Sequence, residues 1–178
     1  MRKAVFLDRD GVINKAIVKS GKPFPPESLD AFEFIPGVVS AALALRKAGF
    51  VVIVVTNQPD VSTGLQTREV VESMHKKIRD AAICDDIKVC YHTDDDNCGC
   101  RKPKPGMLLN AANEWQIDLQ RSFIVGDRWR DVAAGKAAGC QTFFIDYKYQ
   151  EQSAESPDAV VASLQEASRQ ILQLQFTS

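Results

Sequence analysis

Two aspartates at the end of an apolar run could carry out chemistry. Asp8 and Asp10 follow the run at residues 4–7, and Gly11 comes directly after them. The run predicts a buried strand, and open α/β sheets bind their ligands at the carboxyl ends of the strands. An EF-hand calcium loop is excluded, because its twelfth position requires Glu and the twelfth residue counted from Asp8 is Lys19. A glycosyltransferase metal site and a strand that ends in solvated acids stay open at this point.

Polar side chains suited to binding a phosphate occur in three later segments. A continuous β-branched run ends in Thr56 and Asn57, whose hydroxyl and amide groups could donate to a phosphate oxygen. Lys102 lies in a loop ahead of a predicted helix and offers a compact positive charge. Another apolar strand ends in Asp127, with Asp131 in the first turn of the following helix. Three predicted strands therefore end in Asp8, Thr56 and Asp127. This pattern favours a shared active site over a strand that merely ends in solvated acids.

The order of these motifs is informative. An acid pair, Thr-Asn, Lys and Gly-Asp-x-x-x-Asp, each after a predicted strand, resemble the four motifs of the haloacid dehalogenase superfamily of aspartate-nucleophile phosphatases. The resemblance spans residues 4–161. It implies that Asp8 is the nucleophile and forms an aspartyl-phosphate, while Asp10 protonates the leaving group and then activates water. It also implies a Mg²⁺ ion held by Asp8, the backbone carbonyl of Asp10, and Asp127.

The chemistry of phosphoryl transfer explains the remaining residue types. Attack on a phosphomonoester needs an in-line nucleophile, charge neutralisation around the equatorial oxygens and a proton for the departing alkoxide. By the same resemblance, Lys102 clamps the phosphate, Thr56 donates a hydrogen bond to it, and Asp131 orients Lys102. The resemblance therefore implies catalytic roles for Asp8, Asp10, Thr56 and Lys102.

A second group of candidate ligands lies between the second and third of these motifs. Three thiols and one imidazole occur close together, at Cys90, His92, Cys98 and Cys100. A Cys₃His set suits tetrahedral structural zinc, although the C-x-C and C-x-H spacings differ from the common C-x₂-C. Incidental cysteines around a core histidine are the alternative. A disulfide framework is disfavoured by the odd total of five cysteines and by the absence of a recognisable signal peptide.

The position of this cluster narrows the range of families that the chain resembles. A zinc loop directly before Arg101 and Lys102 is similar to that of the D-glycero-D-manno-heptose bisphosphate phosphatases and the related histidinol-phosphate phosphatases. Four protein ligands leave no open position on the metal. The resemblance therefore implies a structural zinc, which shapes residues 90–104 and presents Arg101 and Lys102 to the substrate.

Two substrates fit the sequence around this loop. Residues 103–107 look more like the heptose enzymes, whereas the five-residue gap between His92 and Cys98 looks more like the histidinol-phosphate enzymes. Residues 59–64 read Pro-Asp-Val-Ser-Thr-Gly, where the heptose family usually has Ser-Gly-Ile-Ala-Arg-Gly. We expect a magnesium-dependent phosphatase of a small phosphorylated metabolite, in the first place a D-glycero-D-manno-heptose 1,7-bisphosphate 7-phosphatase. A histidinol-phosphate phosphatase is the alternative enzyme, and a binding module that has lost turnover is the alternative from another class.

The elements that would position these residues alternate along the chain. Their order follows the βαβ rhythm of a parallel sheet and indicates an α/β, Rossmann-like three-layer sandwich of the haloacid dehalogenase type. Strands are expected at 3–7, 51–56, 87–91, 122–126 and 141–145, with a short addition at 158–161. Helices are expected at 37–48, 67–82, 105–116, 129–138 and about 163–173. The polar residues 146–157 predict a loose connector, and we expect one domain over residues 1–178.

The links between these elements leave no room for a cap domain. The segment between the acid pair and the first long helix is short, and the link between the second and third strands holds one helix. We therefore expect an open site whose specificity comes from loops. Asn57, Arg101 and Arg128 are the expected substrate-binding residues, because they adjoin motif residues. Other cations could ring the mouth of the site or could be solvated charges, namely Lys15, Lys19, Lys22 and Arg130.

Composition limits the class of protein. With 178 residues and 45% hydrophobic content, the chain can bury a substantial core. A net charge of −1 argues against nucleic-acid or membrane-surface partners, and no apolar run approaches the roughly 18 residues of a membrane span. We expect a soluble, cytoplasmic monomer whose partner is a small phosphate ester. His75, beside Met74 in a predicted helix, is expected to be a surface or boundary residue.

Overall fold

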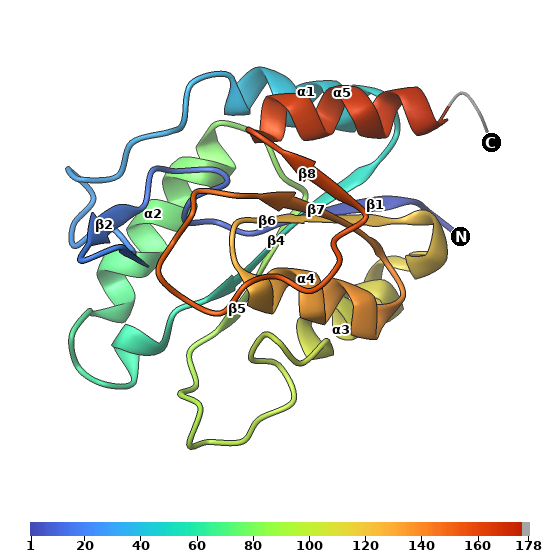
Figure 1. Cartoon of the computed structure of the whole chain (residues 1–178). Coiled ribbons are helices and arrows are strands. Elements are labelled where there is room, and N and C mark those ends of the chain that lie inside the picture. The colour runs from blue at the N-terminus through green and yellow to red at the C-terminus, as the bar shows by residue number, and fades with distance from the viewer. Residues whose placement is uncertain (176–178) are drawn as a thin grey trace.

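A six-stranded parallel sheet forms the middle layer of the molecule (Figure 1). The computed structural model describes residues 1–175. The strand order is β5-β4-β1-β6-β7-β8, and all neighbouring strands in it are parallel. The strands are β1 Ala4–Leu7, β4 Val51–Asn57, β5 Asp86–Cys90, β6 Phe123–Gly126, β7 Gln141–Ile145 and β8 Ala159–Val161. The chain leaves the central β1 towards β4 on one side and later enters β6 on the other, which creates a topological switch point beside β1.

Helices cover both faces of this sheet (Figure 1). The α-helices within the described residues are α1 Val38–Lys47, α2 Arg68–Asp80, α3 Gly106–Trp115, α4 Trp129–Ala138 and α5 Leu164–Gln175. Short 3₁₀ helices lie at Pro59–Val61 and Leu119–Arg121. α1, α2 and α5 pack on one face, and α3 and α4 pack on the other. The expected α/β three-layer architecture is therefore confirmed.

Strand alternation divides the core between the two faces. Val5 and Leu7 of β1 belong to the cluster under α1, α2 and α5, whereas Ala4 and Phe6 belong to the cluster under α3 and α4. All four residues are fully buried, as expected for a parallel strand covered on both faces. Burial of each large apolar side chain contributes about 1.5–3 kcal/mol. This packing fixes the end of β1, and with it the position of the residues that follow.

Local signals set where the helices begin and end. Thr67 caps α2, since the Val70 N–H donates to Thr67 Oγ1 over 3.3 Å. α4 ends at Gly139, whose φ of 87° lies in the left-handed region that glycine adopts without steric cost. At the start of α5, the Glu166 N–H donates to Ser163 Oγ over 3.2 Å. These signals are readable in the sequence, and the predicted helices and strands agree with the observed bounds to within a few residues.

A two-stranded hairpin was not predicted. β2 (Ile17–Lys19) and β3 (Lys22–Phe24) pair antiparallel, with Lys19 opposite Lys22. Each strand has only three residues, and the run lacks a sustained apolar alternation that would mark it in the sequence. In the described chain, this hairpin is the only regular secondary structure between β1 and α1, which agrees with the expected absence of a cap domain. None of the described helices is long and apolar enough to cross a membrane.

Candidate active site

The carboxyl ends of two neighbouring strands and the first turn of α4 bring three aspartates together. Asp8 follows β1 and Asp127 follows β6, and the register pairs Leu7 with Val125. The backbone N–H of Asp8 donates to the Val125 carbonyl over 3.0 Å, which extends the pairing to the first aspartate. Carboxylate oxygens of Asp8, Asp127 and Asp131 all lie within 4.8 Å of one another. The sheet register therefore builds the acidic cluster that the motifs predicted.

Lys102 is the cation at the centre of this cluster. It is only 2% exposed, and its Nζ lies 2.7 Å from Asp8 Oδ1 and 2.6 Å from Asp131 Oδ1. Nζ also donates to the Val55 carbonyl over 2.7 Å, so its three protons are all directed at acceptors. Burial alone would disfavour the charge, but Asp131 and Asp8 raise the pKa of Lys102 above its usual value. The lysine is therefore held rigidly as a cation.

One lysine does not balance three buried acids. Burial raises the pKa of Asp8 to about 6, with Lys102 opposing and Asp131 adding to the shift. Burial also raises the pKa of Asp127 well above its ordinary value, and the charges of Asp8 and Asp131 add to it. A further cation among these oxygens would relieve both effects.

Asp127 meets the requirements of a cation ligand. Its Oδ1 is buried and has no hydrogen-bond partner among the described residues. Gly11, with a φ of +85°, allows this approach, because a Cβ at Gly11 would lie 1.9 Å from Asp127 Oδ2. An orphaned carboxylate oxygen beside a second carboxylate fits a hard divalent ion such as Mg²⁺, which prefers oxygen ligands. The residues present therefore fit the expected metal.

Asp10 is held by donors from three different parts of the site. The Arg9 guanidinium donates to both of its carboxylate oxygens over 3.0–3.1 Å. Asn14 Nδ2 donates to Oδ1 and Gln58 Nε2 donates to Oδ2, each over 2.9 Å. Gln58 Nε2 also lies 2.9 Å from the buried Thr56 Oγ1, which links the first and second motifs. Sequence reasoning missed Arg9, Asn14 and Gln58 as partners of Asp10.

These side chains line an open pocket of about 290 Å³. Asp8, Asp10, Thr56, Asn57 and Lys102 contribute to its wall. Asn57 uses both ends of its amide on the main chain of Lys102, accepting from its N–H over 3.1 Å and donating to its carbonyl over 3.0 Å. In this structure the Asn57 amide therefore positions the lysine, and its expected contact with a substrate phosphate stays a prediction.

The three arginines of the pocket are each paired with a carboxylate. Asp94, in the loop after β5, binds Arg101 Nε over 2.8 Å and Arg130 Nη1 over 3.0 Å. Arg101 Nη1 is buried and has no hydrogen-bond partner among the described residues. Arg128 pairs with Glu151. Asp94 and Glu151 were not identified from the sequence, because single acids in polar loops carry no distinguishing signal.

The loop lysines separate into two groups. Lys22 of the β2–β3 hairpin lines the pocket. Lys15 pairs with Glu33 and Lys19 pairs with Glu27, each over 2.5 Å and on exposed side chains, and neither lysine lines this pocket. Of the three, only Lys22 is placed to meet a substrate.

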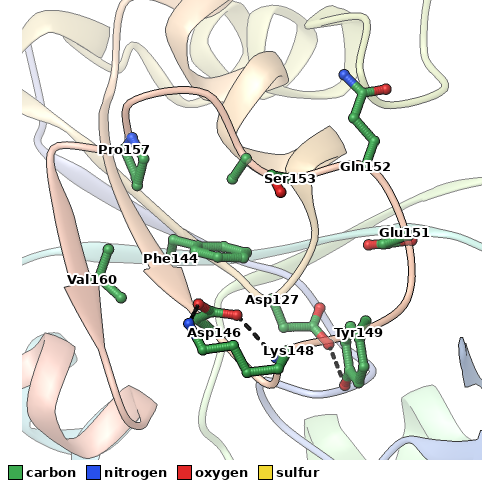
Figure 2. A pocket seen from close by; sticks show the side chains of 11 residues that line it. Asp127, Phe144, Asp146, Lys148, Tyr149, Glu151, Gln152, Ser153, Pro157 and Val160 are labelled. Carbon is green, nitrogen blue, oxygen red and sulfur yellow. Dashed lines mark hydrogen bonds and ion pairs between the residues drawn. The ribbon is translucent and has the colours of Figure 1, made fainter. Parts of the chain in front are cut away.

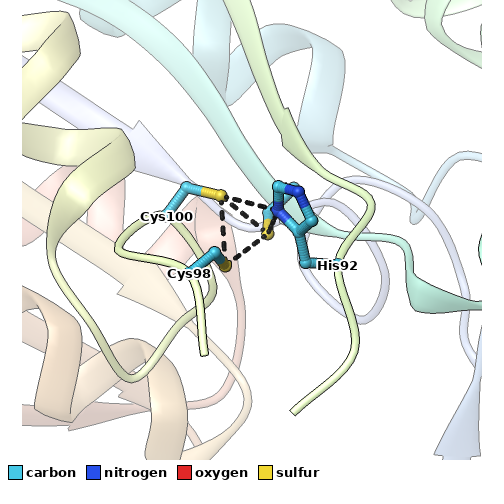
Figure 3. Close-up of side chains that lie close together, drawn as sticks. His92, Cys98 and Cys100 are labelled. Atoms are coloured by element: carbon cyan, nitrogen blue, oxygen red, sulfur yellow. Dashed lines mark hydrogen bonds between the residues drawn. The ribbon is translucent and has the colours of Figure 1, made fainter. Parts of the chain in front are cut away.

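The four predicted zinc ligands converge in the loop between β5 and α3 (Figure 3). Cys90, Cys98 and Cys100 have Sγ–Sγ distances of 2.9–3.7 Å, and His92 Nδ1 lies 3.3 Å from Cys100 Sγ and 3.6 Å from Cys90 Sγ. All five cysteines of the chain are free thiols. The backbone N–H of Arg101 donates to Cys98 Sγ over 3.4 Å, which is a typical contact around a metal-bound sulfur. Four donors arranged around one point fit a tetrahedral zinc ion.

The expectation for His75 was wrong. The residue is 0% exposed and lies on the buried face of α2 with Val71, Met74 and Ile78. Its Nε2 lies 3.3 Å from Arg9 Nη1, and its Nδ1 lies 3.3 Å from Glu72 Oε1. The spacing of four residues from Val71 and three from Ile78 places His75 on the apolar face and could have revealed its burial.

The connector at 146–157 reaches back to the acidic cluster (Figure 2). Tyr149 Oη donates to Asp127 Oδ2 over 2.9 Å, and Tyr147 Oη donates to the Gly11 carbonyl over 2.9 Å. The segment also lines a second pocket of about 370 Å³, which Asp127 borders. Neither tyrosine was predicted to contribute to the site, because the segment lacks periodicity and reads as a polar linker.

The parallel sheet and the strand-end cluster define a phosphatase of the haloacid-dehalogenase-like class. A family model described as HAD-hydrolase-like matches residues 99–167. A crystal structure of a D,D-heptose 1,7-bisphosphate phosphatase from B. bronchiseptica, complexed with magnesium and phosphate, superposes with a TM-score of 0.85. The two chains share 31% sequence identity, over 97% of this chain and 99% of the other.

Curated relatives show which enzymes of this class the chain is similar to. A D-glycero-β-D-manno-heptose-1,7-bisphosphate 7-phosphatase from Rhodopseudomonas palustris is 36% identical over 154 residues, covering 80% of this chain and 82% of the relative. The enzyme of the same name from Pseudomonas putida is 37% identical over 162 residues, covering 86% and 87%. The protein belongs to the haloacid-dehalogenase-like phosphatase family that contains these enzymes.

Proposed function

We propose that this phosphatase removes the 7-phosphate of D-glycero-D-manno-heptose 1,7-bisphosphate through an aspartyl-phosphate on Asp8. The observation that carries the mechanism is the environment of Asp8. Lys102 binds its Oδ1, and the described residues leave its Oδ2 without a donor at the wall of the pocket. Such an oxygen is available as a nucleophile. The relatives, which match this chain over 82% and 87% of their own length, support the choice of substrate.

The reaction divides into two displacements. Asp8 Oδ2 attacks phosphorus, the phosphorus–oxygen bond to the sugar breaks, and Asp10 gives its proton to the departing oxygen. Asp10, now a carboxylate, takes a proton from the water that attacks the aspartyl-phosphate, which restores Asp8 and releases phosphate. Lys102 and Thr56 hold the phosphate oxygens during both steps.

Two metals complete the proposal. Asp8, the backbone carbonyl of Asp10, and Asp127 would hold Mg²⁺, which supplies charge neutralisation at the phosphate when bound. Cys90, His92, Cys98 and Cys100 would hold a structural zinc ion. Reduced thiols in that site suit a reducing compartment, so we place the protein in the cytoplasm.

Pocket residues away from Asp8 would contact the part of the substrate that is remote from the transferred phosphate. Arg101, with its unpartnered Nη1, and Lys22 offer positive charge to a second phosphate. Asp60 also lines the pocket, and its carboxylate has no hydrogen-bond or ion-pair partner among the described side chains. A carboxylate there can accept hydrogen bonds from sugar hydroxyls, and it can equally pair with an ammonium group. Because histidinol phosphate carries an ammonium group, it is the alternative substrate.

Phosphate release from a panel of substrates tests the proposal. We expect the heptose bisphosphate to give a kcat/KM at least tenfold above histidinol phosphate and 4-nitrophenyl phosphate, with Mg²⁺ required for all three. Asp8→Asn should reduce turnover by more than about a hundredfold, because the near-isosteric amide cannot form the covalent intermediate. A higher kcat/KM for histidinol phosphate would show that the proposed substrate is wrong. Full activity in Asp8→Asn would show that Asp8 is not the nucleophile.

A further inference from the structure

A chain of hydrogen bonds leads from Asp10 through the buried Arg9 and His75 to the partly exposed Glu72. Arg9 is 0% exposed, and its guanidinium contacts the Asp10 carboxylate on one side and His75 Nε2 on the other. His75 Nδ1 contacts Glu72, and Tyr91 Oη donates to the same Glu72 oxygen over 2.9 Å. The chain therefore connects the end of β1, helix α2 and the end of β5.

The protonation of His75 follows from its neighbours. An arginine guanidinium has only donors, so Nε2 of His75 accepts the hydrogen bond from Arg9 and carries no proton. Nδ1 then bears the proton and donates it to Glu72. This neutral tautomer satisfies both ring nitrogens. Burial, reinforced by the charge of Arg9, lowers the pKa of His75 to about 4, which is consistent with a neutral ring.

We propose that His75 is a positioning residue for the general acid–base Asp10, and that it acts through Arg9. Arg9 donates to both Asp10 oxygens, so the direction of its guanidinium sets the direction of the carboxylate. His75 accepts from Nη1, the arginine nitrogen that does not contact Asp10. It thereby fixes the rotation of the guanidinium in a site closed to water, where an unpaired donor is costly.

This inference rests on the proposed role of Asp10 as the acid in the first displacement. A misplaced acid slows bond cleavage most when the leaving oxygen needs a proton, and least when that oxygen is already a stable anion. The kinetic consequence of His75 should therefore depend on the leaving group. A purely structural role would slow all substrates alike.

The test compares phenyl phosphate with 2,4-dinitrophenyl phosphate, since both fill the pocket with a similar ring and differ in their need for a proton. The measured quantity is kcat/KM, which reports the steps through release of the phenol. We expect His75→Leu to lower kcat/KM for phenyl phosphate at least tenfold and for the dinitrophenyl ester less than threefold. His75→Gln can still accept from Arg9 and donate to Glu72, so it should recover most of the loss.

Matched controls separate positioning from general loosening of the helix. Ile78→Ala removes a fully buried side chain one turn further along α2 without touching Arg9, and it should affect both esters equally. Glu72→Ala changes a partly exposed side chain, and it should show the pattern of His75→Leu in weaker form. If His75→Leu does not fold, the Glu72→Ala variant still carries the test.

Asp10→Asn shows which idea fails if the expected pattern does not appear. A strong leaving-group dependence in Asp10→Asn, with equal losses for both esters in His75→Leu and Glu72→Ala, overturns the role of His75 and leaves the proposed function intact. Equal losses for both esters in Asp10→Asn overturn the role of Asp10 as acid and the inference with it.

Discussion

Charge balance around Lys102 governs the site at the level of single residues. The lysine is buried between Asp8 and Asp131, and Asp127 lies in the same cluster. Removing one partner of a buried ion pair lowers the free energy of unfolding much more than removing an exposed charge, because the remaining charge stays unpaired in a medium of low polarity. The same lysine that is expected to bind phosphate therefore also stabilises the folded protein.

Lys102→Met tests this double role. We expect the free energy of unfolding, measured by urea denaturation in magnesium-free buffer, to fall by about 3 kcal/mol, and phosphatase activity to fall more than about a hundredfold. Added Mg²⁺ should stabilise the variant more than the wild type, because it replaces part of the lost positive charge.

Lys76→Met is the matched control. Lys76 pairs with Asp80 one turn along the exposed face of α2, and both side chains are more than half exposed. Such a pair contributes only about 0.3–0.5 kcal/mol. A loss in Lys102→Met no larger than that of the control would show that the buried pair does not stabilise the fold.

The loop between β5 and α3 matters as a whole element. Cys90 lies at the end of β5, and Cys98 and Cys100 come just before Lys102. Asp94 in the same loop holds Arg101 and Arg130. A metal that ties these ligands together would fix Lys102 and two pocket arginines without touching the substrate.

Cys98→Ser should loosen this loop. We expect zinc content to fall from about one ion per chain to well below one, with faster hydrogen exchange over residues 90–104. Activity should drop between about tenfold and a hundredfold, because a displacement of about 1 Å at Lys102 is enough for such a loss.

Cys84→Ser serves as the control, since Cys84 is a free thiol outside the four-ligand cluster. Its zinc content and loop exchange should match the wild type. Full activity in Cys98→Ser protein that holds no zinc would disprove the link between the loop and the site.

At the scale of the whole molecule, His75 makes folding stability depend on pH. Burial first, and then the charge of Arg9, lowers its pKa from 6.5 to about 4, with Glu72 opposing and Arg79 adding to the shift. Above pH 6.5 the ring is neutral in both the folded and the unfolded chain, so it contributes no pH dependence. Between pH 6.5 and 4 the unfolded chain binds a proton that the folded chain does not, and stability falls as the pH falls.

We expect this proton to cost the wild type up to about 3 kcal/mol of unfolding free energy between pH 6.5 and 4. Urea denaturation of wild type and His75→Gln across this range measures it, because the variant cannot titrate at position 75. The other titrating groups are common to both proteins and cancel in the difference. Parallel stability curves would show that His75 titrates normally in the folded state.

Much of the fold and the identity of the main site residues could be read from local sequence. Apolar runs that end abruptly in Asp or Thr mark strands and the polar groups at their carboxyl ends, because both features lie within a few adjacent residues. The parallel sheet then brings these ends to one edge. Close spacing also brings the Cys₃His set together, since Cys90 ends β5 and the other three residues lie in the loop that follows. The sequence by itself therefore determined the α/β class, the acidic cluster and the grouping of three cysteines with one histidine.

Only the tertiary structure decided which side chains support those residues. Arg9 meets His75 across 66 residues, Arg130 meets Asp94 across 36, and Tyr149 meets Asp127 across 22. Each contact depends on how a helix or loop packs against the sheet edge, and a pair of distant polar residues leaves no periodic signal in the chain. Helical spacing marks the face of α2 on which His75 lies, but the contact of its Nε2 with Arg9 depends on how α2 packs against the end of β1.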